Sequence, residues 1–263
     1  MTTLKDTITA RRAIVRFAWN RRVHYGLYQA GRIRLYQGSP FHRGQLTSQY
    51  APVKEVRLLA PCRPSKIVCV GQNYREHARE LGNPIPEEPL IFLKPPSAVI
   101  GPHQTILRPP GAQRVDHECE LGVVIGRRCF QVTPDQALDH VLGYTCVNDV
   151  TERVLQAKDV QYTRAKGFDT FCPLGPAIAL DLEPQNLAVR CFLDGQLRQE
   201  GHTSDMIFPV ATLVSFVSQV MTLRPGDVIA SGTPHGVGPM QAGQTVTVEV
   251  EGLGRLVNPV ADR

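Results

Sequence analysis

Two glutamates stand two residues apart at the start of an apolar run, in the stretch VDHECELGVVIG at residues 115–126. The run that follows them, Leu121 to Ile125, is largely β-branched and predicts a buried strand. Side chains alternate between the faces of a strand, so Glu118 and Glu120 are expected on the same face. Two buried like charges need a proton, a basic partner or a metal ion. For an E-x-E motif alone, an edge strand with both glutamates in water is the alternative.

A third carboxylate ends a second segment that alternates in strand fashion, GYTCVND at residues 143–149. This pattern brings Asp149 to the C-terminal end of the predicted strand. Three carboxylates without a nearby cluster of His or Cys suit a hard cation that keeps several water ligands. Glu118, Glu120 and Asp149 therefore predict a site for Mg²⁺ or Mn²⁺ rather than Zn²⁺.

A candidate acid–base pair follows the stretch IVCVGQNY. The pattern predicts a strand over residues 67–70 and then a helix, with Asn73 as its N-cap and Glu76 in the capping-box position. In such a helix His77 and Glu80 are three residues apart on one face, within mutual reach. An exposed pair on a helix surface is the alternative, but junctions of this kind often hold ligands.

A lysine stands in RAKGFDTFCPLGP, within a segment rich in polar side chains. Small and aromatic residues flank Lys166, so its ammonium group could lie partly buried against a carboxylate or a substrate. An ordinary surface lysine is an equal alternative on the sequence alone.

The elements around these residues are mostly strands. Residues 13–36 predict a three-stranded antiparallel unit, with a polar turn at Asn20 and Arg21, that ends at Gly38 to Pro40. Helices are expected over residues 134–141 and, from its apolar spacing, after Pro209. TVTVEVEG is expected to close the chain as an alternating strand.

The first part of the chain is unusually basic. Residues 1–57 hold 11 Lys and Arg against two acidic residues, a net charge of +9, whereas the rest carries −4. A basic segment can bind nucleic acid, but these arginines alternate with apolar residues as on a solvated sheet face, so nucleic acid is an unlikely partner. Pro61 and Pro64 predict a linker. We therefore expect a small basic β domain over residues 1–60 and a catalytic domain over residues 61–263.

Composition limits the class of protein. At 263 residues, with 42% hydrophobic and 20% charged residues, the chain is typical of a globular protein with a sizeable core. It contains no apolar stretch of 18 residues, and MTTLKDTITARR lacks the apolar core of a secretory signal. Seven scattered cysteines without a C-x-x-C motif predict reduced thiols and a cytoplasmic location. Cys119, between the two glutamates, is expected to pack in the core.

Beyond these patterns, the chain from about residue 13 resembles the fumarylacetoacetate hydrolase superfamily, particularly its acylpyruvase-type and 2-hydroxyhepta-2,4-diene-1,7-dioate isomerase-like bacterial members. The resemblance rests on stretches in a fixed order: KIVCVGQNY, IFLKPPSAVIGP, VDHECELGVVIG, GYTCVNDVT, RAKGFDTFCPLGP, TSDMIFPV and RPGDVIASGTPHGVGP. It implies a mixed α+β, β-rich fold, with a barrel or roll flanked by helices beside a small N-terminal β domain. It also implies a homodimer.

The resemblance also implies roles for individual residues. The metal ligands would be Glu118, Glu120 and Asp149, and His77 with Glu80 would form the general-base dyad. Lys166 would contact the oxyanion of the substrate. The implied substrate-binding residues are Arg153, Gln156, Tyr162 and Thr233.

The resemblance, with which the chemistry of these residues agrees, implies a metal-dependent enzyme of 2-oxo or 2,4-dioxo acids. Cleavage of an acylpyruvate or loss of CO₂ from oxaloacetate leaves an enolate, which the metal and Lys166 would stabilise. Hydrolytic C–C cleavage of acylpyruvates, oxaloacetate decarboxylation or both are the main expectation. A tautomerase or isomerase of oxaloacetate or of 2-hydroxyhepta-2,4-diene-1,7-dioate is the alternative, and a non-catalytic nucleic-acid-binding protein is a weaker one.

Overall fold

The computed structural model describes residues 4–80, 82 and 84–263. Its largest sheet has twelve strands. Ten of them follow one another across the sheet as β4 (His42–Ala51), β3 (Arg32–Ser39), β2 (Arg22–Gln29), β1 (Arg12–Trp19), β14 (Cys172–Ala179), β12 (Val141–Asn148), β11 (Cys119–Ile125), β17 (Val228–Ala230), β6 (Ile67–Gly71) and β7 (Leu90–Lys94). Off this path, β5 (Arg57–Leu58) pairs with β1, and β8 (Val99–Ile100) pairs with β14.

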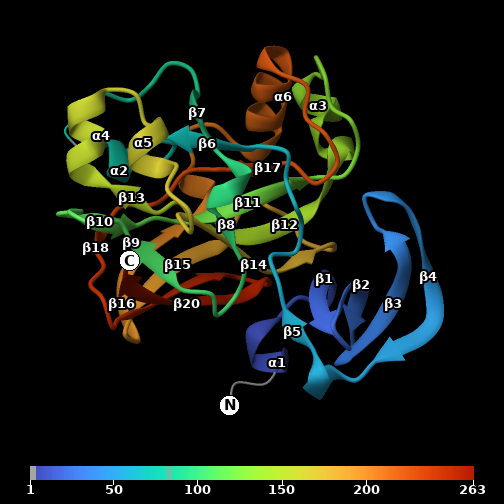
Figure 1. The fold of residues 1–263 in the computed structure, drawn as a ribbon. Helices are drawn as coiled ribbons and strands as arrows, with labels where there is room; N and C mark the ends of the chain where they lie inside the picture. The colour runs from blue at the N-terminus through green and yellow to red at the C-terminus, as the bar shows by residue number, and fades with distance from the viewer. Residues whose placement is uncertain (1–3, 81, 83) are drawn as a thin grey trace.

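Two smaller sheets complete the β structure (Figure 1). A five-stranded sheet consists of β16 (Gln196–His202), β15 (Ala188–Leu193), β19 (Thr245–Val250), β20 (Gly254–Asp262) and β9 (Ile106–Arg108). A three-stranded sheet consists of β13 (Thr151–Glu152), β10 (Val115–His117) and β18 (Gly238–Pro239). The predicted fold class, a β-rich roll with flanking helices and a small N-terminal β unit, is confirmed.

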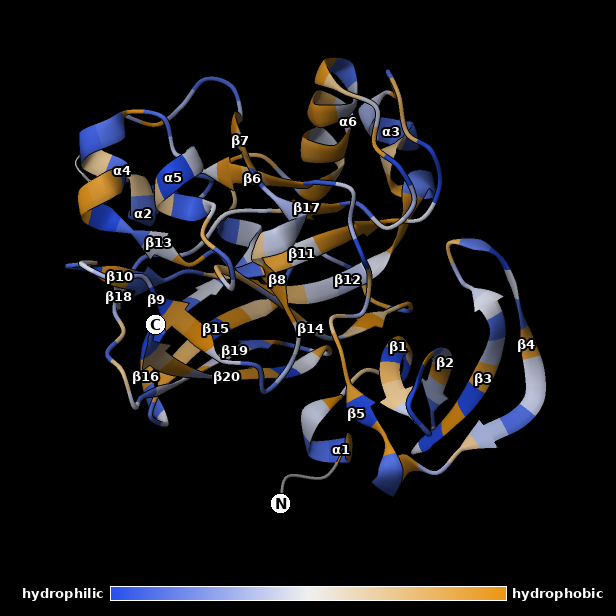
Figure 2. Ribbon diagram, viewed as in Figure 1, coloured by the Kyte–Doolittle hydropathy of each residue, from blue (hydrophilic) through white to orange (hydrophobic). Residues whose placement is uncertain are grey.

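The helices are short and flank the sheets. The α-helices are α1 (Leu4–Thr7), α2 (Arg75–Glu80), α3 (Pro134–Ala137), α4 (Arg153–Asp159), α5 (Thr163–Lys166) and α6 (Val210–Val220). Single 3₁₀ turns are η1 (Val53–Glu55), η2 (Pro96–Ala98), η3 (Leu138–His140) and η4 (Thr203–Asp205). The helices predicted over residues 134–141 and after Pro209 are both present, the first as α3 continued by η3 and the second as α6, whose residues are mostly hydrophobic (Figure 2). No helix in the described part of the chain is long and apolar enough to cross a membrane.

The first four strands, β1 to β4, form an antiparallel N-terminal meander over residues 12–51, which has the predicted hairpins and one strand more. Asn20 and Arg21 form a two-residue loop with positive φ angles between β1 and β2, a backbone that matches the twist of paired strands. The expectation that the unit ends at Gly38 to Pro40 is wrong, because the chain turns there and returns as β4. Most residues of β4 are exposed, as in an edge strand, so its sequence lacks the apolar alternation that reveals a strand.

The C-terminal end also differs from the prediction. The first six residues of TVTVEVEG form β19, but this strand does not close the chain, because β20 follows it and pairs with it in antiparallel register. Strand β20 alternates buried and partly exposed residues, but Asn258 occupies one of its buried positions. The Asn258 amide donates hydrogen bonds to the backbone oxygens of Gly101 and Gln104, so a polar residue stands where the pattern requires an apolar one.

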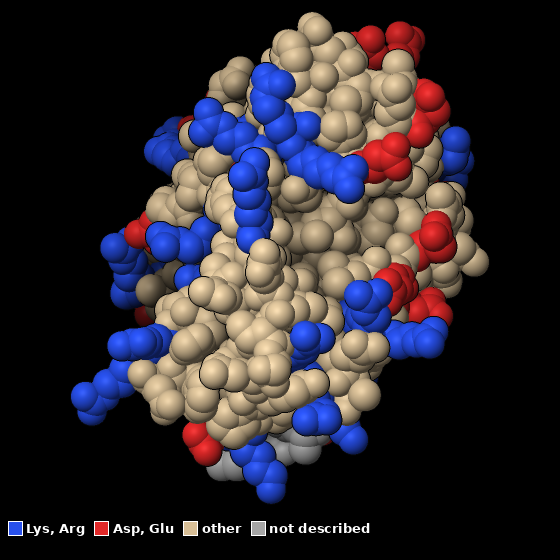
Figure 3. All heavy atoms as spheres, turned by 90° about the vertical axis from the view of Figure 1, so that its right-hand side faces the viewer, with Lys and Arg blue, Asp and Glu red and all other residues tan. Residues whose placement is uncertain are grey.

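The basic residues of the meander are spread rather than clustered. Figure 3 shows Lys and Arg side chains distributed between uncharged residues over this side of the molecule. Exposed arginines of the N-terminal strands and turns include Arg21, Arg22, Arg32, Arg43 and Arg57. The meander is hydrogen-bonded to the rest of the large sheet through Ala13 and Ile14 of β1, which pair with Ala179 and Ile178 of β14.

Candidate active site

The pairing of β11 with β12 brings the three carboxylates together. These strands are antiparallel, and Cys119 lies opposite Asn148, so the residues just outside the pair, Glu118 and Asp149, are neighbours. The backbone N–H of Asp149 donates to the Glu118 carbonyl at 2.9 Å. Potential ligand atoms of Glu118, Glu120 and Asp149 all lie within 4.8 Å of one another.

All three carboxylates are buried, so the alternative of an edge strand facing water is wrong. Every residue of β11 is buried, as the apolar run predicts. Cys119 packs in the hydrophobic core, as expected. Glu120 of β11 and Glu118, which directly precedes the strand, thus belong to one shared cluster, while the rest of the strand packs in the interior.

Two of the carboxylates are neutralised by basic side chains of the protein. Glu118 forms ion pairs with Arg153 Nη2 at 2.6 Å and with Lys166 Nζ at 2.9 Å. Asp149 accepts hydrogen bonds from Lys166 on Oδ2 and from Lys94 on Oδ1, both at 2.6 Å. Burial alone would raise the pKa of Glu118, but Lys166 and Arg153 lower it more, so the pKa lies below its ordinary value.

Glu120 has no such neutralisation. Its Oε2 accepts a hydrogen bond from the backbone N–H of Gly232 at 2.9 Å, and among the described residues it forms no ion pair. Burial raises the pKa of Glu120, and the nearby Asp149 and Glu118 raise it further. A buried carboxylate beside two others, without a cation of its own, fits a bound divalent ion, and an all-oxygen ligand set fits Mg²⁺ or Mn²⁺.

The predicted dyad is present on α2. His77 Nδ1 lies 3.0 Å from Glu80 Oε2, and Glu80 Oε1 accepts a hydrogen bond from the backbone N–H of Gly236. His77 is buried and lines the cavity, whereas Glu80 is exposed, so the alternative of a pair that lies wholly on the helix surface is wrong. Because Nδ1 is held by Glu80, Nε2 is the ring nitrogen left for a substrate.

The prediction of a capping box at Asn73 is wrong. The helix begins at Arg75, and the Asn73 amide donates instead to the backbone oxygens of Phe208 and Ser231. Its Oδ1 accepts from the backbone N–H of Phe208. Tertiary contacts override the local cap here, because Asn73 ties the segment before the dyad to two distant loops.

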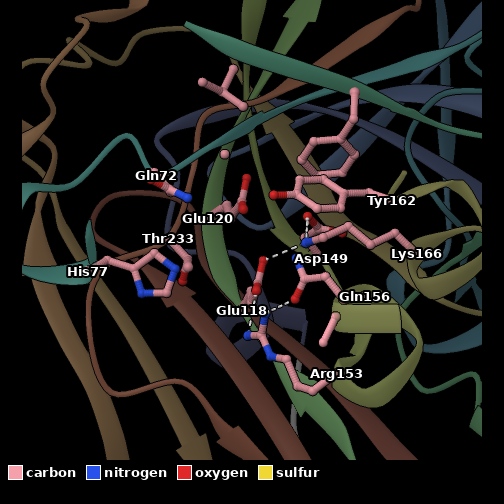
Figure 4. Close-up of a pocket in the computed structure, with 14 residues that line it drawn as sticks. Gln72, His77, Glu118, Glu120, Asp149, Arg153, Gln156, Tyr162, Lys166 and Thr233 are labelled. Atoms are coloured by element: carbon pink, nitrogen blue, oxygen red, sulfur yellow. Dashed lines mark hydrogen bonds and ion pairs between the residues drawn. The ribbon is translucent and has the colours of Figure 1, made fainter. Parts of the chain in front are cut away.

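One cavity of about 380 Å³ brings the predicted site residues together. In Figure 4, His77 and Thr233 lie on one side of the carboxylates, and Arg153, Tyr162 and Lys166 lie on the other. Other residues that line the cavity include Gln72, Phe92, Gln156 and Ala157. All ten predicted site residues are near this cavity, nine of them in its lining, with Glu80 behind His77.

The wall opposite His77 is a network of charged and aromatic groups. Lys166 is 3% exposed, which excludes a surface lysine. Burial lowers its pKa, but Asp149 and Glu118 raise it more, so the pKa lies above its ordinary value. Its Nζ lies 4.7 Å from the centre of the Phe92 ring, and Phe92 contacts Tyr162 edge-on at 5.4 Å between ring centroids.

Three buried supporting residues were not predicted. Lys94 contacts Asp149, and Asp116 accepts hydrogen bonds from Arg153 and Arg114. Gln199 donates to Thr233 Oγ1 and to the Pro234 carbonyl, both at 2.8 Å. A lysine that ends an apolar strand, as in LIFLK, is a signal that could have revealed Lys94.

Comparison with known proteins decides the family. A family model described as fumarylacetoacetate (FAA) hydrolase C-terminal matches residues 66–261. The chain belongs to the fumarylacetoacetate hydrolase family. A second family model, described as Rv2993c-like, N-terminal, matches residues 12–61.

Relatives of this fumarylacetoacetate hydrolase family member include named enzymes. The mitochondrial oxaloacetate tautomerase FAHD2B of Bos taurus is 44% identical over 222 residues, which make up 80% of this chain and 71% of the bovine protein. A solved 2-hydroxyhepta-2,4-diene-1,7-dioate isomerase from Mycobacterium marinum is 42% identical, with a TM-score of 0.89 and coverage of 96% of this chain and 99% of that one. A solved 5-carboxymethyl-2-hydroxymuconate delta-isomerase from Mycobacterium smegmatis is 44% identical, with a TM-score of 0.90 and coverage of 95% of this chain and 100% of that one.

Proposed function

We propose that the protein is a divalent-metal-dependent enzyme that interconverts the keto and enol forms of a small 2-oxo dicarboxylic acid, with oxaloacetate as the first candidate. The names of the similar tautomerase and isomerases support this reaction type. The observation that carries the proposal is the position of Lys166, whose Nζ lies at the cavity beside the carboxylate cluster. An ammonium group there can stabilise the negative oxygen of an enolate.

The charges of the cluster favour a dianionic substrate. In formal charge, the three basic side chains of Lys94, Lys166 and Arg153 offset three carboxylates, those of Glu118, Glu120 and Asp149, although none of the ion pairs among the described residues includes Glu120. A further carboxylate that contacts Arg153, that of Asp116, is balanced by Arg114. A divalent cation would therefore leave two positive charges, which match the two carboxylates of oxaloacetate.

Glu118, Glu120 and Asp149 would hold the metal, which when bound polarises the oxygen of a 2-oxo acid as a Lewis acid. His77, oriented by Glu80, would remove a proton from C3 of the substrate. The electron pair of that C–H bond becomes the C2–C3 double bond, and the C2 oxygen takes the negative charge. Lys166 would donate a hydrogen bond to this oxygen. The oxygen then takes a proton from water to give the enol, and His77 releases to solvent the proton that it took from C3. Arg153, Gln156, Tyr162 and Thr233 would orient the substrate.

Hydrolysis of an acylpyruvate is a second candidate, and the His77–Glu80 dyad favours it. A histidine whose Nδ1 is held by a carboxylate can take a proton from water at Nε2, so that the water attacks the distal carbonyl. Cleavage of the C–C bond would leave the same enolate beside Lys166. Oxaloacetate decarboxylation needs the enolate but no attacking water.

The test is a substrate panel. Oxaloacetate, acetylpyruvate, fumarylpyruvate and 2-hydroxyhepta-2,4-diene-1,7-dioate are assayed with Mg²⁺, with Mn²⁺ and with excess chelator. We expect acceleration of oxaloacetate tautomerisation that requires the metal. Full activity in chelator would overturn the metal assignment, and cleavage of an acylpyruvate without tautomerisation of oxaloacetate would make the hydrolase the better proposal.

Three further proposals follow from the sequence. We propose a domain boundary near residue 60, a homodimer, and a cytoplasmic location. Light scattering of the purified protein tests the dimer, and a mass equal to one chain would contradict it. Salt-dependent binding of the purified protein to nucleic acid would revive the weaker, non-catalytic alternative.

A further inference from the structure

Asp149 lies between two lysines that differ in their surroundings. Lys166, at the end of α5, lines the cavity and also contacts Glu118. Lys94, at the end of β7, is not among the residues that line the cavity and is 1% exposed. One lysine can therefore reach a substrate, whereas the other lies behind the cavity wall.

Both hydrogen bonds that the Lys94 ammonium group forms with described residues go to the segment that carries Asp149. Its Nζ donates to Asp149 Oδ1 at 2.6 Å and to the backbone oxygen of Val150 at 3.0 Å. Strand β7 is paired with β6 up to Lys94, which lies opposite Ile67, so the lysine backbone is fixed in the sheet. Removing an ammonium group from water costs free energy that contact with one carboxylate oxygen does not always offset, so such a pair is expected to have a role besides stability.

We propose that Lys94 is a positioning residue, the permanent counter-ion that fixes Asp149 Oδ1 from behind the cavity. Asp149 Oδ2 then faces the cluster with Glu118 and Glu120. Because Lys94 remains on Oδ1, Lys166 can leave Oδ2 for the substrate without leaving Asp149 uncompensated. This inference rests on the metal site of the proposed function.

The role of Lys94 predicts a link between its charge and metal binding. Without Lys94, the metal-free cluster lacks one positive charge, and a divalent cation can supply it. Lys94→Met should therefore lower the unfolding temperature of the metal-free protein by roughly 10 °C, from the usual cost of breaking a buried pair in a chain of this size. Excess Mg²⁺ or Mn²⁺ should therefore raise the unfolding temperature of Lys94→Met by more than it raises that of the native protein.

A second lysine–aspartate pair, in which the aspartate is buried and the lysine is partly exposed, gives a control away from the cavity. Lys66 Nζ donates to Asp227 Oδ2 at 2.6 Å, and Asp227 is fully buried. Neither residue lines the cavity or belongs to the carboxylate cluster. Lys66→Met should lower the unfolding temperature equally with and without metal, so its metal-induced shift should equal that of the native protein.

The experiment is thermal unfolding of the native protein and the variants, each in excess metal and in chelator. A double variant, Lys94→Met with Asp149→Asn, removes the charges of both partners, and it should recover most of the stability that Lys94→Met loses in chelator. If Lys94→Met does not fold, this double variant still decides the question.

A double variant as unstable as the single one would show that Lys94 only fills space. A metal-induced shift in the unfolding temperature of Lys94→Met equal to that of the native protein would also overturn the proposal. If the native protein shows no metal-induced shift, the metal assignment fails, whereas the double variant still tests Lys94.

Discussion

Two buried carboxylates, Glu120 on β11 and Asp227 just before the neighbouring strand β17, have opposite surroundings. Asp227, just before β17, accepts hydrogen bonds from the backbone and hydroxyl of Ser65, the backbone and Nζ of Lys66, and the backbone of Arg224. Glu120, on β11, accepts one hydrogen bond, from the backbone of Gly232. Both side chains are almost completely buried.

The difference separates a structural carboxylate from a binding one. Burial would raise the pKa of Asp227, but Lys66 and Ser65 lower it more, so its pKa lies below its ordinary value. The pKa of Glu120 is raised by burial and by the neighbouring Asp149 and Glu118. A fold normally satisfies its own buried charges. The carboxylate that it leaves unsatisfied is the one expected to meet a cation from outside the chain.

The largest effect should come from the unsatisfied carboxylate. Glu120→Gln should reduce metal-dependent turnover to the background rate, because it removes a charged ligand from the cluster. Its metal-free unfolding temperature should equal or exceed the native one, since repulsion with Asp149 and Glu118 is relieved. Turnover at the native rate would mean that Glu120 is not a ligand, which would break the comparison.

The dyad should come next. His77→Ala should slow hydrolysis of an acylpyruvate by roughly 10²–10⁴-fold, the usual scale for loss of a general base. Metal binding, measured by calorimetry, should survive, because His77 is not among the proposed ligands. Native rates of hydrolysis and tautomerisation in this variant would make the dyad structural.

Lys166→Met should slow every reaction that passes through an enolate, by roughly 10²–10³-fold, as for other lost oxyanion donors. The assays are tautomerisation and decarboxylation of oxaloacetate and hydrolysis of an acylpyruvate. If one of the three keeps its native rate, Lys166 does not contact the oxyanion in that reaction.

Asp227→Asn should affect turnover least. It should cost about 1.5–3 kcal/mol of the free energy of unfolding at neutral pH, because the charged hydrogen bond between Asp227 and the partly exposed Lys66 is lost. The pKa of Asp227 is depressed in the folded protein, so its stabilisation is present above the unfolded pKa and is lost as the pH falls through the folded pKa. The gap between native and variant in urea unfolding should therefore shrink at acid pH, while kcat per folded molecule stays unchanged. A specific loss of kcat would contradict a purely structural role.

The parts of the site that local sequence patterns encode could be predicted. Alternation along β11 and β12 located Glu118, Glu120 and Asp149, and the spacing of three residues on a helix located His77 and Glu80. The resemblance supplied the roles of Lys166 and the substrate-binding residues. Short turns also revealed the hairpins of the meander.

Long-range contacts could not be predicted in this way. Lys94 meets Asp149 from 55 residues away, and Gln199 reaches Thr233 across 34 residues. Asn73 matched a local cap but is bound to Phe208 and Ser231 instead. The sequence indicated repulsion between Glu118 and Glu120 but could not tell whether a proton, a basic partner or a metal relieves it. In the structure basic side chains neutralise Glu118 and Asp149, and among the described residues Glu120 has no ion pair.

The most direct test of this account is a calorimetric titration of the metal-free protein with Mg²⁺ and with Mn²⁺, beside Glu120→Gln and Asp227→Asn. We predict one ion per native chain, the same binding in Asp227→Asn, and binding at least tenfold weaker in Glu120→Gln, a loss of about 1.4 kcal/mol or more. No binding to the native chain, or equal affinity in Glu120→Gln, would contradict the claim that these three carboxylates form a metal site.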